Sequence, residues 1–182
     1  MNSSPNHKAM KYNLLVSISI IGLLLSSNSQ AQKSKNSNPI KIVNKFDEAA
    51  VTWFKTTGNA SIKGVAKFKS RTGEVRFGKA FRIELMPYSK YTEERLHHIY
   101  KNKQGGHVYV EDGVPTFTPD PKGYHDTKKT RCDQEGMFEF NHLPAGDYYL
   151  VAFMLWDKRG GGIMRHVVVS GNETKVIKMT NF

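Results

Sequence analysis

The sequence lacks cysteine pairs and the common metal-binding spacings of histidine and cysteine. Its 182 residues contain one cysteine, Cys132, so no disulfide can form within the chain. The seven histidines show no H-x-x-H or H-E-x-x-H spacing, and no C-x-x-C pair exists. These absences argue against a disulfide-stabilised miniature domain and against the common zinc motifs. We interpret Cys132 as a half-buried, inert thiol, with a reactive or interchain role as the alternative.

Long hydrophobic runs are also lacking, with one exception near the N-terminus. The run LLVSISIIGLLL covers residues 14–25, which is shorter than the about 20 residues that a membrane-spanning helix needs. Two lysines precede it, and Ser29-Gln30-Ala31 has the small-x-small pattern of a cleavage site. We therefore expect residues 1–31 to be a secretory signal peptide. The mature protein is then exported, to the periplasm or beyond, without a transmembrane segment.

Negative charge is in short supply. The chain has 27 Lys and Arg residues against 16 Asp and Glu residues, a formal net charge of +11. A basic exported protein can bind anionic partners such as acidic glycans or wall polymers. The basic residues are scattered, however, and no nucleic-acid-binding motif is present. We expect a generally solvated basic surface and no nucleic-acid partner.

The strongest pattern lies in residues 130–156, TRCDQEGMFEFNHLPAGDYYLVAFMLW. Asp133 to Gly136 is typical of a tight turn, and residues 137–140 form a strand candidate with two phenylalanines on one face. Residues 143–146 contain Pro and Gly, which break regular structure. Residues 148–154 are nearly all apolar and predict a second, buried strand. Together these segments predict a β-hairpin.

This stretch resembles a known family. The pattern D-x-x-G-x-F-x-F-x-x-L-P-x-G-x-Y of the carboxypeptidase regulatory-like domain is matched without a gap by Asp133, Gly136, Phe138, Phe140, Leu143, Pro144, Gly146 and Tyr148. The resemblance extends over about residues 61–179 and is strong from residue 130 onward. It implies a transthyretin-like (prealbumin-like) β-sandwich, usually an accessory module without an active site. The stretch PYSKYTEERLHHIY is similar to a helical insert in exported bacterial forms of this domain.

The remaining pattern agrees with a β-rich domain. Alternating or short apolar segments predict strands in residues 61–69, 75–77, 81–86, 107–110, 165–169 and 174–179, and the last two form a second hairpin. Residues 88–103 predict a short helix capped by Thr92, and Gly160-Gly161-Gly162 predicts a flexible connector. We therefore expect a mainly β fold, an antiparallel two-sheet sandwich of Greek-key type over residues 60–182.

Residues 32–59 predict a flexible lead followed by an amphipathic helix. Apolar residues recur at spacings of three and four from Ile42 to Phe54, which favours about three helical turns. The aromatic pair Trp53 and Phe54 gives this helix a strongly hydrophobic surface. We expect the helix to pack on the sandwich, and the alternative is that it is exposed and docks a partner.

Exposed aromatic residues are the best candidates for ligand binding. The segment 111–128, rich in Pro and Gly, predicts a long loop of the kind that often carries function. Aromatic rings beside polar groups can hold sugars or peptides. The candidate residues are Tyr109, Phe117, Tyr124, His125, Trp156 and Arg159. The alternative is that these rings only cover the core.

No catalytic, cofactor-binding or metal-binding residue is predicted. No nucleophile motif such as G-x-S-x-G is present. Transthyretin-like purine-pathway hydrolases carry a Tyr-Arg-Gly-Ser tail, whereas this chain ends in Lys178-Met179-Thr180-Asn181-Phe182. Three hypotheses remain. The first is a non-catalytic binding module of the cell envelope with a protein or wall partner. The second is a carbohydrate- or anionic-glycan-binding protein that uses residues 111–128 and the exposed aromatic residues, and the third is a metal-binding protein or small metalloenzyme that uses scattered histidines.

Overall fold

The structure is a computed structural model that describes residues 38–78 and 81–182. The predicted signal peptide, residues 1–31, and the start of the predicted lead lie outside the described residues. The strands are β1 (Ile40–Lys41), β2 (Ala60–Lys69), β3 (Val75–Arg76), β4 (Arg82–Pro87), β5 (Gly105–Tyr109), β6 (Phe117–Thr118), β7 (Lys128–Arg131), β8 (Met137–Leu143), β9 (Gly146–Trp156), β10 (Arg159–Val169) and β11 (Thr174–Thr180). The helices are the α-helix α1 (Lys90–Tyr100) and three 3-10 helices, η1 (Ala49–Lys55), η2 (Val110–Asp112) and η3 (Lys122–His125). The predicted mainly β class is confirmed.

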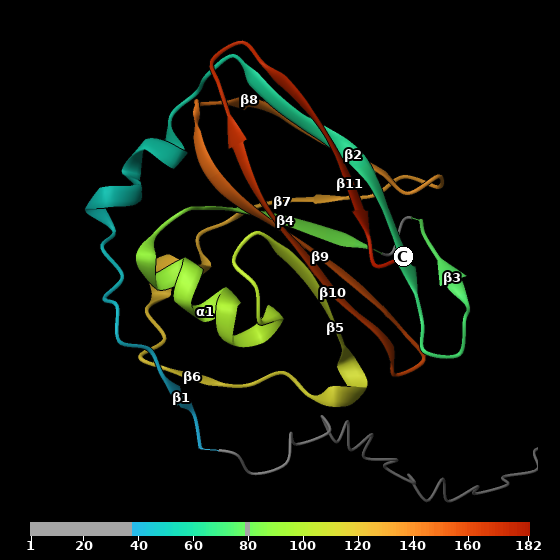
Figure 1. The fold of residues 1–182 in the computed structure, drawn as a ribbon. Coiled ribbons are helices and arrows are strands. Elements are labelled where there is room, and N and C mark those ends of the chain that lie inside the picture. The colour runs from blue at the N-terminus through green and yellow to red at the C-terminus, as the bar shows by residue number, and fades with distance from the viewer. Residues whose placement is uncertain (1–37, 79–80) are drawn as a thin grey trace, which may run out of the picture. The chain divides into compact units, whose positions relative to one another are not determined.

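The largest sheet has five antiparallel strands in the order β5-β10-β9-β4-β7 (Figure 1). A second sheet is built around β2, which pairs in parallel with β11 on one edge. On its other edge β2 pairs antiparallel with β8 and, further along, with β3. A short parallel ladder joins β1 to β6. Sheet pairing is therefore mostly antiparallel, with two parallel ladders among the described strands.

The main hydrophobic core takes residues from both large sheets. Strand β2 points Ile62, Ala66 and Phe68 into it, as its alternating pattern predicts, and β9 points Leu150 and Met154 into it from the other sheet. A second cluster lies on the opposite face of the five-stranded sheet, under α1. Strand β9 is thus buried on both faces, which explains its almost uninterrupted apolar sequence.

The predicted hairpin of residues 137–154 is wrong. Strand β8 pairs with β2 in the second sheet, whereas β9 pairs with β4 and β10 in the five-stranded sheet. The turn at Pro144 and Ala145 carries the chain from one sheet to the other. The physical reason is burial, because β9 needs neighbours on both edges and cover on both faces, which a lone hairpin partner cannot supply.

The expected glycine connector is also wrong, because Gly160, Gly161 and Gly162 lie within β10. The turn falls earlier, at Asp157 and Lys158, which both have positive φ, 44° and 63°. A β-carbon on Gly161 would come 2.8 Å from the Phe68 ring, and one on Gly162 would come 2.6 Å from the Tyr100 hydroxyl. The glycines therefore admit aromatic side chains against both faces of the strand.

The predicted final hairpin is wrong for a related reason. Strand β11 pairs with β2 in parallel and shows no ladder with β10 among the described strands. Its inward residue Met179 is fully buried in the main core. The turn residues 170–173 thus connect two sheets, as residues 144–145 do, and local turn chemistry alone could not reveal this.

The predicted N-terminal helix is replaced by shorter elements. Ile40 and Lys41 form β1, and only the seven residues of η1 are helical. The apolar residues of this segment contact different surfaces: Ile42 and Phe46 belong to a cluster with α1 and β6, whereas Phe54 enters the main core. The three- and four-residue spacing therefore does not describe one continuous helical face. The predicted inserted helix is confirmed as α1, but Ser89, not Thr92, is its cap and accepts a hydrogen bond from the Thr92 amide at 3.0 Å.

Two substitutions in β9 test the double burial of this strand. Leu150 is fully buried between the sheets, whereas Leu155 is 56% exposed at the end of the opposite face. Leu150→Ala should lower the free energy of unfolding by about 2–5 kcal/mol, the usual cost of a cavity in a core. The matched change Leu155→Ala should alter it by no more than about 0.5 kcal/mol. Denaturant unfolding of both variants checks this, and equal effects would contradict the assigned faces.

Candidate functional site

The candidate site is a pocket of about 410 Å³ on the face of the five-stranded sheet that also carries α1. Its floor is formed by β4, β9 and β10, one wall by α1 and β5, and the other wall by residues 110–127. The volume lies in the range of about 300–1,000 Å³ that small-molecule sites occupy. Most lining side chains are apolar: Met86, Leu96, Ile99, Val108, Val110, Val114, Pro115, Phe117, Val151, Phe153 and Leu155. A second cavity, near η1, holds only about 120 Å³.

The pocket exists because α1 covers only part of the sheet. The helix packs Leu96 and Tyr100 onto Met86, Tyr149 and the strands around them. Beyond the end of the helix, the apolar face continues through Phe153 and Leu155. The segment 110–127 crosses over that part without filling it.

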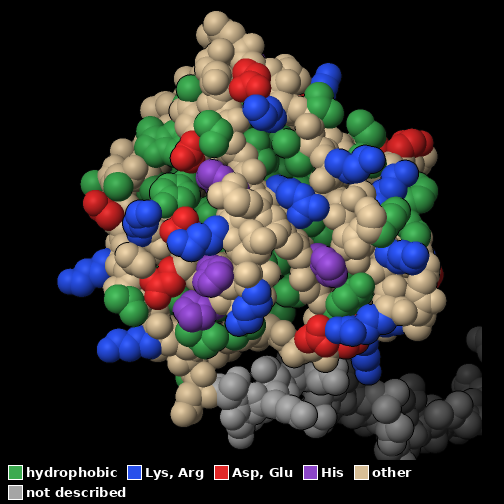
Figure 2. All heavy atoms as spheres, in the orientation of Figure 1, with side chains coloured by type: hydrophobic (Ala, Val, Ile, Leu, Met, Phe, Trp, Pro, Cys, Tyr) green, Lys and Arg blue, Asp and Glu red, His purple; other side chains and the backbone are tan. Residues whose placement is uncertain are grey.

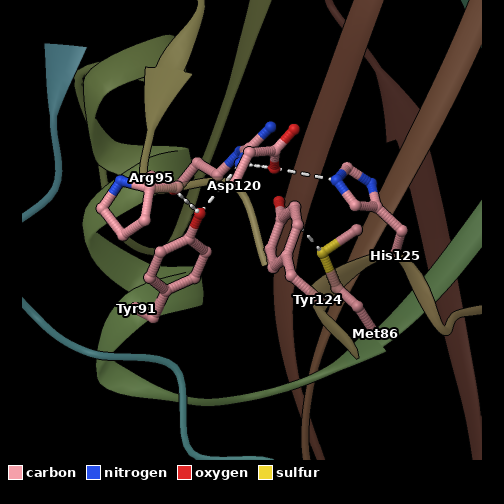
Figure 3. A network of polar contacts seen from close by, with 7 residues as sticks. Met86, Tyr91, Arg95, Asp120, Tyr124 and His125 are labelled. Atoms are coloured by element: carbon pink, nitrogen blue, oxygen red, sulfur yellow. Dashed lines mark hydrogen bonds and ion pairs between the residues drawn. The ribbon is translucent and has the colours of Figure 1, made fainter. Parts of the chain in front are cut away.

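Arg95 of α1 fastens this segment to the helix (Figure 3). Its guanidinium lies 4.7 Å from the ring centre of Phe117 and 4.4 Å from that of Tyr124. It donates hydrogen bonds to the Tyr91 hydroxyl at 2.9 Å and to Asp120 Oδ1 at 2.5 Å. The Arg95 side chain is only 13% exposed. Simultaneous contact with two aromatic rings, a carboxylate and a hydroxyl suits the guanidinium of arginine better than the ammonium of lysine.

The surroundings of Asp120 and Arg95 favour the ionised form of both side chains. Burial alone would raise the pKa of Asp120, but hydrogen bonds from Arg95 and His125 hold it below its ordinary value. Burial alone would lower the pKa of Arg95, but the hydrogen bonds to Asp120 and Tyr91 and the nearby Tyr124 raise it. Both groups therefore stay ionised at neutral pH.

His125 lies at the outer end of the network. Its Nε2 is 2.8 Å from Asp120 Oδ1, and Figure 3 shows Asp120 between His125 and Arg95. Burial raises the pKa of the neighbouring Tyr124 to about 12, and the Tyr124 hydroxyl donates to the Met86 sulfur at 3.9 Å. A His–Asp pair resembles half of a catalytic triad, yet here the carboxylate oxygen is already shared with a guanidinium.

A second polar group borders the floor of the pocket. Arg82 Nε contacts Glu84 Oε1 at 3.0 Å, and the Thr127 hydroxyl donates to Glu84 Oε2 at 3.4 Å. The Arg82 guanidinium also lies 5.2 Å from the ring centre of Phe153. Each cation that lines the pocket is therefore paired with a carboxylate.

The structure divides the sequence-predicted ligand residues into two groups. Phe117, Tyr124 and His125 converge on the pocket. Tyr109 and Trp156 instead pack against Phe68 on the other face of the sheet, with ring centres 5.4 Å and 6.2 Å from its ring. There the Trp156 ring nitrogen donates to Glu74 Oε2 at 3.2 Å, and Arg159 lies 3.8 Å from the same oxygen.

The predicted docking pair is also divided. Phe54 is buried in the main core, and Trp53 is half-buried against it and against Tyr148. A β-carbon on Gly146 would come 2.5 Å from the Trp53 ring, so this glycine admits the ring. An open surface hollow beside Trp53 is bordered by Tyr88 and Lys90.

Sequence reasoning missed several residues of the pocket. Arg95, Tyr100, Phe153 and Gly162 all line it, and none was singled out as a ligand residue. The available signal for Arg95 was a lone arginine on the predicted helix, close in the fold to a loop rich in aromatic residues. Nothing in the spacing of Phe153 and Gly162 distinguishes a pocket floor from any other strand.

Neither Cys132 nor the histidines form part of a metal cluster within the described residues. Cys132 is 3% exposed, and burial together with the nearby Asp133 raises the pKa of its thiol to about 11. Over residues 38–78 and 81–182, no three His, Cys, Asp or Glu side chains are arranged to share a metal ion. In the same range no helix is long and apolar enough to span a membrane.

Figure 2 shows Lys and Arg side chains spread among acidic and histidine side chains on the face that carries α1.

Comparisons with known proteins bear on the fold. No family model matches the chain, and no curated protein matches it. A crystal structure from Pseudomonas aeruginosa is similar, with a TM-score of 0.60 and 24% identity over 76% of this chain and 99% of that chain. That protein is provisionally described as carbohydrate-binding. At this identity the likeness concerns the mainly β fold.

Asp120→Asn tests the fastening of the pocket wall. We expect a loss of about 1 kcal/mol in the free energy of unfolding at pH 7, because Asp120 is half exposed while its partner Arg95 is mostly buried. The folded-state pKa of Asp120 is lowered from its ordinary value of 3.8. The contribution is therefore fully present above about pH 4 and declines as the pH falls through the folded-state value.

Unfolding measurements of wild type and Asp120→Asn between pH 7 and pH 2 check both statements. Asp112→Asn is the matched control, because its pair with Arg71 is exposed on both sides and should contribute little. A pH-independent difference between wild type and Asp120→Asn would show that the carboxylate charge is not involved.

Proposed function

We propose that this chain is an exported, non-catalytic binding module of the cell envelope, and that it holds a small molecule in the pocket between the five-stranded sheet, α1 and residues 110–127. The observation that carries the proposal is the pocket itself, with its volume of about 410 Å³ and its mainly apolar lining. Its partner is then a component of the envelope, and no cofactor is required.

We further propose that the fold is the transthyretin-like β-sandwich of the carboxypeptidase regulatory-like domain. The residues of the resemblance support this by their structural roles. Asp133 Oδ1 accepts from the amides of Glu135 and Met137, and Gly136 has a positive φ of 84°. The Tyr148 hydroxyl donates to the carbonyl of Pro144 at 2.5 Å. The matched residues therefore build turns and core.

The pairing of the polar groups supports binding without catalysis. Asp120 accepts from Arg95 and lies against His125, and Glu84 accepts from Arg82 and Thr127. A general base must be free to take a proton from a substrate. These carboxylates instead stabilise the walls of the pocket.

Carbohydrate binding is the second candidate function. It is favoured by the provisional description of the similar Pseudomonas aeruginosa protein. Within this chain, Phe117 and Tyr124 supply aromatic rings beside polar side chains, which is an arrangement that sugars use. Arg95 covers a face of each of these rings, which leaves less aromatic surface for a sugar.

Thermal unfolding with two panels of compounds tests the proposal and separates its two forms. One panel contains mono- and oligosaccharides, and the other contains small lipophilic compounds. A ligand at about 100 times its Kd should stabilise the protein by about 2.7 kcal/mol and raise Tm by about 5–10 °C. We expect such a shift from members of at least one panel.

The pocket is then identified with a blocking variant. Leu155→Trp places a large ring at the pocket and should reduce the affinity at least about tenfold. Val176→Trp is the matched control, because Val176 is exposed on β11 in the other sheet. No shift with either panel, or an equal shift in Leu155→Trp, would contradict binding in this pocket.

A further inference from the structure

The hydroxyl of Tyr100 is the most unusual polar group in the pocket. Tyr100 ends α1, lines the pocket and is 7% exposed. Within residues 38–78 and 81–182, its hydroxyl forms no hydrogen bond. The hydroxyl is not among the enclosed side-chain atoms of the described residues that lack a partner, so it is open to the pocket and free to hydrogen-bond a molecule that occupies the pocket.

The fold makes room for this hydroxyl. Tyr100 reaches across to β10, where a β-carbon on Gly162 would come 2.6 Å from its oxygen. Glycine at this position therefore lets the phenol oxygen approach the strand that forms the floor. Burial raises the pKa of Tyr100, so the group remains protonated and can donate a hydrogen bond.

The charges around the pocket are balanced. Arg95 is paired with Asp120, and Arg82 is paired with Glu84. A charged ligand would lose its hydration here and find only counter-ions that are already engaged. A free sugar would bury several hydroxyls against mainly aliphatic side chains and leave them without partners.

We propose that the pocket takes a neutral, mainly apolar molecule with a single hydrogen-bond-accepting oxygen, such as a ketone or ester, and that this oxygen accepts from the Tyr100 hydroxyl. This inference rests on the proposed function, because it concerns the same pocket. The apolar body lies against Val151, Phe153 and Val108, and the oxygen points toward α1.

A pair of probes isolates the hydrogen bond. 2-Acetylnaphthalene has a carbonyl oxygen, and 2-ethylnaphthalene has nearly the same shape without one. The Kd of each probe is measured for wild type and for Tyr100→Phe, which form a double-mutant cycle. We expect the ratio of the two Kd values to change by about threefold to tenfold on removal of the hydroxyl, through weaker ketone binding.

Two readouts guard against a merely structural effect. Tyr100→Phe should leave Tm unchanged or slightly higher, because the hydroxyl has no partner within the described part of the chain. Its affinity for 2-ethylnaphthalene should also stay the same. Tyr109→Phe, on the other face of the sheet, should change neither Kd.

The outcomes separate this inference from the function on which it rests. An unchanged ratio of Kd values overturns the role of Tyr100, while pocket binding stands. If sugars bind and naphthalenes do not, and Leu155→Trp weakens the sugar binding, the proposed ligand class is wrong. The proposed function of the chain as a binding module then still stands. If no compound binds, or if Leu155→Trp weakens the binding of none of them, both this inference and the proposed function are overturned.

Discussion

The structure depends on the burial of β9 on both of its faces. Leu150 and Met154 face the second sheet, and Tyr149 and Val151 face α1. A strand that is apolar on both sides requires cover on both sides, because each exposed face would cost about 25 cal/mol per Å² of apolar surface. The helix supplies this cover only in part, and the pocket lies where the cover is incomplete.

The second constraint is the attachment of residues 110–127. This segment contains only short regular elements, so contacts with the rest of the domain hold it in place. Arg95 contributes through Asp120 on one side and the rings of Phe117 and Tyr124 on the other. The Tyr91 hydroxyl also donates to the Pro119 carbonyl at 2.7 Å, and β6 pairs with β1. The N-terminal segment is attached to the same helix, because Glu94 accepts hydrogen bonds from the amides of Val43 and Asn44 at 2.8 Å. Helix α1 therefore positions both peripheral segments of the domain.

The sequence allowed the mainly β class, the inserted helix and the faces of β2 to be predicted, because each depends on local periodicity. Pairing between strands could not be predicted in the same way. The Leu143–Gly146 turn has the residue types of a hairpin turn, yet it connects two sheets. Gly161 and Gly162 lie in a strand because Phe68 and Tyr100 occupy the space that their side chains would fill. Three of the six predicted ligand residues meet in the pocket. Arg95 and Tyr100 join them only through the packing of α1, which no spacing in the sequence encodes.

The central claim, that the incompletely covered face of β9 is a binding site, is tested most directly by methyl NMR. A titration of the protein with 2-acetylnaphthalene should shift the methyl resonances of Met86, Val108 and Val151, which line the pocket. The methyl resonances of Leu150 and Met179, buried between the two sheets, should stay in place. Shifts confined to residues outside the pocket, or no shifts at saturating probe, would contradict the account.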